Sequence, residues 1–158
     1  MRSMTIDAVD GMPFVDDVLA PAAEMLRRLR RAMRGRLQAL GTLLRELRAL
    51  LAVEERWLLP ELARSFHDGP RSGWLAAVGD RLHRMEDSVA CLLRIGPSAP
   101  ETPAIVASLQ DLLARHLREQ RTLLAAALDA GLIRPGERLA RFTRRAWHAV
   151  RGGGPAAA

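Results

Sequence analysis

The chain has 158 residues, of which 49% are hydrophobic and 27% are charged, and its formal net charge is +6. This size and balance predict one globular domain and exclude a disordered chain. Aromatic residues make up only 4%, and the 24 basic residues are all Arg because the chain contains no Lys. Since Leu, Ala and Arg favour helices and β-branched residues are few, we expect an all-α fold.

Cysteine usage and apolar runs indicate the compartment. The single cysteine, Cys91, excludes a disulfide within the chain and fits a reducing environment. The first seven residues lack the continuous apolar stretch of a secretory signal, and no apolar run is long enough to span a bilayer. We therefore expect a cytoplasmic protein without a membrane segment.

Turn residues and apolar stripes divide the chain into four long helices and one shorter helix. A lead-in covers residues 1–15, and a flexible tail covers 151–158. The first helix starts near Asp16, and the others cover about 42–66, 73–95, 103–130 and 135–149. Short connections make neighbouring helices antiparallel. The predicted fold is an up-down antiparallel four-helix bundle over 16–150 with a short C-terminal fifth helix.

One carboxylate falls on an apolar stripe. In the second helix the stripe comprises Leu44, Leu47, Leu51, Leu58 and Leu62, and Glu54 lies within it. A buried carboxylate needs a cation, a hydrogen-bond donor or a metal ion. The partner of Glu54 is therefore the main question that the sequence raises.

Two histidines are predicted to lie at the level of Glu54. Glu54 and His83 are equidistant from the loop after the second helix, and His83 and His116 are equidistant from the next loop. Because all helices rise equally per residue, the three side chains share one layer of an up-down bundle. His116 lies on its helix's apolar stripe, whereas His83 borders its own. A metal site, a metal-free Glu–His pair and a neutralising Arg are the alternatives.

The order and spacing of these segments resemble the hemerythrin-like (HHE cation-binding) domain family. The similar segments are Val53-Glu54-Glu55-Arg56-Trp57-Leu58-Leu59-Pro60, His83, His116-Leu117-Arg118-Glu119-Gln120 and a closing tail helix. The resemblance implies an up-down bundle around a non-haem di-iron centre with oxygen-binding, sensing or iron-related roles. It implies Glu54, His83 and His116 as metal ligands.

This chain departs from the family pattern at several ligand positions. No His occurs before His67, Leu50 stands where the family has a His, and Gln120 replaces the closing Glu. Glu119 is one residue away and points about 100° from that position on a helix. The remaining ligands are too few for two irons. We expect at most a reduced metal site, or a metal-free interaction or regulatory module.

One face of the first helix carries the densest positive charge, from Arg27, Arg30, Arg31 and Arg34. This face suits an acidic or protein partner, and a solvated face is the simpler alternative. The chain contains no recognisable nucleic-acid-binding motif, no phosphate-binding glycine loop and no nucleophile motif. We therefore predict no catalytic residues and no enzymatic activity.

Overall fold

The computed structural model describes residues 6–35, 39–66 and 72–152, and this part of the chain is all-α. The helices are α1 (Ile6–Arg34), α2 (Leu40–Val53), η2 (Glu54–Leu58), α3 (Leu59–Phe66), α4 (Ser72–Ile95), α5 (Thr102–Asp129) and α6 (Glu137–Val150). The segments α2, η2 and α3 follow one another without a break, as the single predicted second helix requires. The all-α prediction is confirmed.

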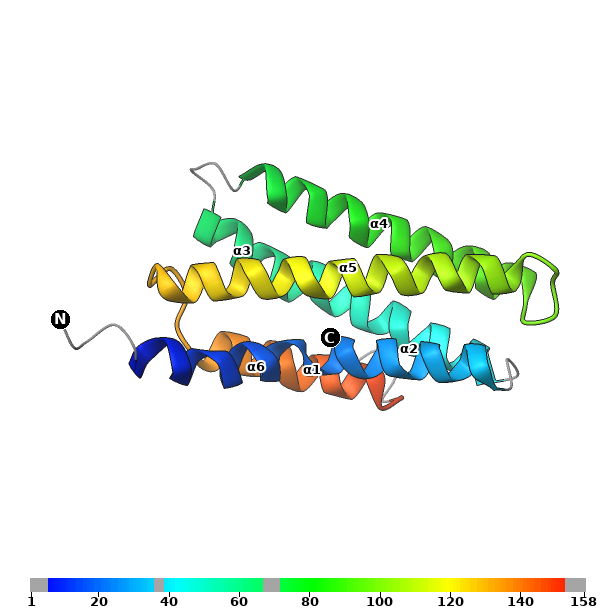
Figure 1. The fold of residues 1–158 in the computed structure, drawn as a ribbon, viewed down its shortest axis with the longest axis horizontal. Coiled ribbons are helices and arrows are strands. Elements are labelled where there is room, and N and C mark those ends of the chain that lie inside the picture. The colour runs from blue at the N-terminus through cyan, green and yellow to red at the C-terminus, as the bar shows by residue number, and fades with distance from the viewer. Residues whose placement is uncertain (1–5, 36–38, 67–71, 153–158) are drawn as a thin grey trace.

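The helices lie side by side, and the chain reverses direction at each connection (Figure 1). Helix α1 packs against α5, α6 and α2, while α4 packs against α5, α2 and α3. Helix α6 packs against both α1 and α2, so the predicted fifth helix is a docked part of the core. Its buried residues include Leu139, Phe142 and Ala146, which lie at helical spacing on one face. None of the described helices has the length and apolar character needed to cross a membrane.

The start of the first helix differs from the prediction. Helix α1 begins at Ile6 rather than near Asp16, and Pro21 lies well inside it. Val15, Val18 and Leu19, which precede Pro21, are at most 5% exposed. Burying each of these side chains stabilises the fold by roughly 1.5–3 kcal/mol, and the three together exceed the roughly 3 kcal/mol cost of one proline in a helix. Residues 1–5 of the predicted lead-in and 153–158 of the predicted tail lie outside the described residues.

A widened turn interrupts the long helix at Glu54. The segment η2 is a π-helix, in which the N–H of Leu59 donates to the carbonyl oxygen of Glu54, five residues earlier. Pro60 follows directly, and a proline ring clashes with the carbonyl four residues before it in a regular helix. The wider turn gives that carbonyl room. Single π turns of this kind are frequent at functional sites.

Two glycines, one inside α4 and one directly after it, permit a test of the backbone contribution to stability. Gly96 ends the helix with a φ of +82°, whereas Gly79 lies in the helix interior, and an added Cβ would meet no atom within 4 Å at either position. Gly79→Ala should therefore stabilise the protein by about 0.5–1 kcal/mol, because Ala favours helix. Gly96→Ala should destabilise it by roughly 1–2 kcal/mol, because a left-handed φ strains an L-residue. Urea unfolding followed by circular dichroism measures both, and equal effects would contradict the helix end assigned here.

Candidate functional site

The interior contains a direct bond between two of the predicted site residues. Nε2 of His116, on α5, lies 2.7 Å from Oε2 of Glu54, on η2. The His116 side chain is fully buried and that of Glu54 is 3% exposed. A bond between two groups so far from water is difficult to replace by hydration. Of the alternatives that the sequence left open, the structure contains the Glu–His pair.

The surroundings of this pair are mainly apolar. Leu50, one turn before Glu54, and Gln120, one turn after His116, are each 1% exposed. In the described part of the chain, Nδ1 of His116 and Oε1 of Gln120 have no hydrogen-bond partner. The two side chains of the pair are therefore bonded to each other, while Nδ1 of His116 and Oε1 of the nearby Gln120 are left without a partner among the described residues.

His83 does not join this pair. Its side chain is 71% exposed, and Nδ1 lies 3.5 Å from Oε2 of Glu86, on the same helix. Glu86 in turn interacts with Glu55, the neighbour of Glu54, so α4 and η2 meet near the level that the sequence indicated. The rotation of α4 decides the outcome, because Leu82 and Met85 take the inward positions. The predicted ligand set Glu54, His83 and His116 is therefore not assembled.

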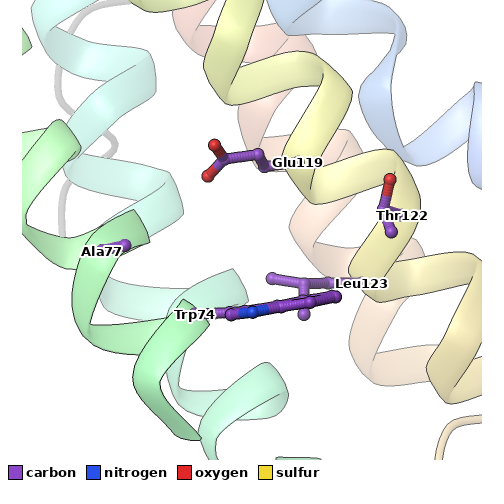
Figure 2. A pocket seen from close by; sticks show the side chains of 5 residues that line it. All are labelled: Trp74, Ala77, Glu119, Thr122 and Leu123. Atoms are coloured by element: carbon purple, nitrogen blue, oxygen red, sulfur yellow. The ribbon is translucent and has the colours of Figure 1, made fainter. Parts of the chain in front are cut away.

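Glu119 also points away from the buried pair, as its position on the helix predicts. Its carboxylate accepts two hydrogen bonds from the guanidinium of Arg81, on α4. The carboxylate lines a pocket of about 280 Å³ between α4 and α5, together with Trp74, Ala77, Thr122 and Leu123. Figure 2 shows the Trp74 ring beside Leu123 at one end of this pocket. Since Arg81 neutralises Glu119, the pocket offers a mainly apolar surface.

Arg28 connects three helices, and this role was not predicted from the sequence. The guanidinium of Arg28 forms an ion pair with Glu46 of α2 and donates to the carbonyl oxygen of Val150, at 2.8 Å from Nη1. This contact ties the end of α6 to α1 and α2. In the sequence, Arg28 looks like the other Arg residues around it. Only its position next to the apolar stripe on a helical wheel could have indicated that it is half-buried.

The predicted Arg face is exposed on α1. Arg27 pairs with Glu24 at 2.6 Å, while Nε of Arg34 donates to the backbone oxygen of Arg30. In the described part of the chain, no carboxylate is bonded to Arg30, Arg31 or Arg34. Within the described ranges, three of the four positive charges of this face therefore lack an acidic partner.

The donor set does not fit the iron that the family resemblance implies. Across residues 6–35, 39–66 and 72–152, no group of three or more His, Cys, Asp or Glu side chains could hold a metal ion. Leu50 offers no donor atom, and an amide such as Gln120 is a poor ligand for iron. Among the described residues, the buried imidazole and the buried carboxylate are those of His116 and Glu54, and these two are bonded to each other.

Comparison with known proteins gives no match: no family model, no curated protein and no solved structure matches the chain. The hemerythrin-like assignment therefore stays a prediction from the sequence.

The energetic role of the buried pair can be tested by removing one or both partners. Glu54→Leu or His116→Leu should each destabilise the protein by about 3–5 kcal/mol, because each leaves a buried polar group without its partner. The double variant should be less destabilised than either single variant. Urea unfolding measures all three, and His83→Ala is the control, expected to change little. If the stability losses of the two single variants simply add up in the double variant, Glu54 and His116 are not directly coupled.

A third prediction concerns the carboxylates of Glu86 and Glu55, where α4 meets η2. Burial raises the pKa of Glu86 above its ordinary value of 4.5, and the adjacent Glu55 raises it further, while His83 opposes the shift. A raised pKa means that the folded state holds this proton more tightly than the unfolded state. The ionised form of Glu86 therefore destabilises the folded protein, and this destabilisation grows as the pH rises from 4.5 through the raised pKa of Glu86.

Glu86→Gln should accordingly raise the melting temperature at pH 7 and leave it almost unchanged at pH 4. Thermal unfolding at both pH values measures this difference. Glu101→Gln is the control, since Glu101 is an exposed glutamate in the connection between α4 and α5. A larger gain at pH 4 than at pH 7 would contradict the direction of the shift.

Proposed function

We propose that this chain is a metal-free, hemerythrin-like four-helix bundle that works as a non-catalytic interaction or regulatory module. In this proposal α1, the continuous α2–α3 segment, α4 and α5 form an up-down bundle, and α6 closes it. The reversals of direction in Figure 1 support this arrangement. The order of the Glu54, His83 and His116 segments supports the family assignment.

The observation that carries the metal-free proposal is the closed Glu54–His116 pair. A 2.7 Å bond uses the carboxylate oxygen and ring nitrogen that would otherwise face a metal. His83 lies at the surface, and Leu50 fills a position next to Glu54 with an apolar side chain. With no interior chemistry supported, the exposed Arg face of α1 is the feature through which the module would contact a partner.

The alternative is a reduced metal site on Glu54, His83 and His116. The unbonded Nδ1 of His116 and Oε1 of Gln120 are the observation that favours some further ligand in the interior. Such a site would require His83 to leave the surface of α4. The described contacts of His83 give no support for that movement.

Metal analysis of the purified protein distinguishes the metal-free proposal from the reduced metal site. After growth with added iron, manganese and zinc, we expect less than about 0.1 equivalent of any of them, and no visible absorption band. The Glu54→Leu/His116→Leu variant should carry the same amount as the unmodified protein. Stoichiometric metal that is lost in this variant and in His83→Ala would overturn the metal-free proposal in favour of the reduced site.

A further inference from the structure

Helix α6 forms a positively charged surface where it borders η2 and α3. Nη1 of Arg138 lies 3.4 Å from Oε1 of Glu61, on α3, and the guanidinium of Arg145 lies 4.3 Å from the centre of the Trp57 ring, on η2. Arg138 and Arg145 are two helical turns apart, so one face of α6 makes both contacts. We call the arginines of this face, with their neighbours on η2 and before α6, the α6 basic surface: Arg56, Trp57, Arg134, Arg138, Arg141 and Arg145.

Most of the positive charge of this surface has no counter-charge. In the described part of the chain, three of its arginines are bonded to no carboxylate: Arg56, Arg134 and Arg145. Arg138 and Arg141 lie 3.4 Å from Glu61 and 4.0 Å from Glu137, and both arginine side chains are more than half exposed. Exposed pairs at such distances contribute little to stability. The arginines of this surface can therefore bind carboxylates of another molecule.

Trp57 holds two of these arginines in place. The guanidinium groups of Arg145 and Arg56 lie over its ring, at 4.3 Å and 5.6 Å from the ring centre. Trp57 is half-buried and packs against the core, so its ring is a fixed support for both. A guanidinium stacked on an aromatic ring keeps N–H groups at its edge that can donate to a carboxylate. Since this stacking restricts the two side chains in advance, an acidic partner would lose less conformational entropy on binding.

A hollow with apolar walls lies at one end of the α6 basic surface. Its volume is about 270 Å³, and its lining includes Arg134 and Arg138 together with Leu132, Ile133 and Leu139. Leu132 is 51% exposed, and it is one of two large apolar side chains that are clearly exposed in the described residues. The hollow lies at the end of the molecule where α3 ends and where the chain turns from α5 into α6 (Figure 1). It offers an apolar side chain of a partner a place directly beside the arginines.

This combination of groups favours a protein segment over a nucleic acid. Single-stranded nucleic acids need aromatic faces on which their bases can stack, whereas guanidinium groups already lie over the Trp57 ring. The apolar walls of the hollow offer nothing to a phosphate group. Protein interfaces, in contrast, are enriched in arginine and tryptophan and place apolar side chains in pockets. Charge complementarity then requires that the partner segment be acidic.

We propose that the α6 basic surface binds an acidic amphipathic segment of another protein. Carboxylates of this segment pair with the arginines, and one of its apolar side chains enters the hollow beside Leu132. The inference rests on the proposed interaction module, and it adds to the Arg face of α1 a second contact surface with a stated partner chemistry.

Fluorescence anisotropy with two labelled peptides tests the proposal. One peptide repeats the unit Glu-Glu-Leu, and the other repeats Glu-Glu-Ser, which carries the same charge without apolar side chains. At 50 mM NaCl we expect the leucine peptide to bind about tenfold more tightly than the serine peptide, because the hollow removes a leucine side chain from water. Binding of both peptides should weaken as salt is added, because exposed charges are screened.

Variants assign this binding to the α6 basic surface. Arg134→Gln/Arg138→Gln and Arg141→Gln/Arg145→Gln should each weaken binding of the leucine peptide by about tenfold, because each removes two charged donors. Leu132→Ser should reduce the preference for the leucine peptide to about twofold or less and leave the affinity for the serine peptide unchanged. Circular dichroism confirms that each variant is folded.

Arg30→Gln/Arg31→Gln is the matched control, because it removes the same charge from exposed positions of α1 outside this surface. The control should bind the leucine peptide like the unmodified protein. A loss confined to the control would overturn this inference and leave an interaction module that uses α1. An equal loss in all charge variants, or no peptide binding at 50 mM NaCl, would also overturn it.

Other occupants of the surface give different results. Tighter binding to a 20-nucleotide single-stranded DNA or to phosphatidylserine vesicles than to the leucine peptide would overturn the proposal. Sedimentation analysis tests a second copy of the chain as the occupant, and a dimer that dissociates in Arg134→Gln/Arg138→Gln would overturn it as well. None of these outcomes bears on the interior, since only the metal analysis tests whether the bundle is metal-free.

Discussion

The bond between Glu54 and His116 is the constraint on which the interior depends. It joins η2 to α5, across 62 positions of sequence, in a core made mainly of leucine and other apolar side chains. A shift of either helix by one residue would turn one partner toward apolar side chains and leave the other buried without a bond. Desolvation makes that state costly, so the pair fixes the rotation and height of both helices.

The same bond limits what the interior can do chemically. A buried carboxylate and a buried imidazole are typical ligands of a metal site in a helical bundle, but here they are bonded to each other. Leu50 and Gln120 occupy the flanking turns without supplying a ligand that iron prefers, and His83 faces solvent. The pair thus has a structural role, which is to hold η2 and α5 together in the interior.

At the surface, the distribution of arginine matters more than its amount. Arg81, Arg28 and Arg121 pair with Glu119, Glu46 and Asp16, and these contacts connect α4 with α5, α1 with α2 and α5 with α1. Among the described residues, Arg30, Arg31 and Arg34 near the end of α1 have no carboxylate partner, and their charge remains exposed. The net charge of +6 therefore includes a group of positive charges on α1 that no carboxylate neutralises among the described residues and that can attract an anion over several ångströms.

The sequence by itself determined the all-α class, the positions of the connections and the burial of Glu54 and His116. Apolar spacing fixes these features, because a stripe with helical period can be buried in only one way. It also placed Glu54, His83 and His116 near one level, because helix rise is constant. It did not determine that α1 begins at Ile6, since tertiary burial of Val15 and Val18 outweighs a proline in the helix. Only the tertiary structure decided that His83 faces solvent, because the neighbouring helices select Leu82 and Met85 for the core and thereby set the rotation of α4.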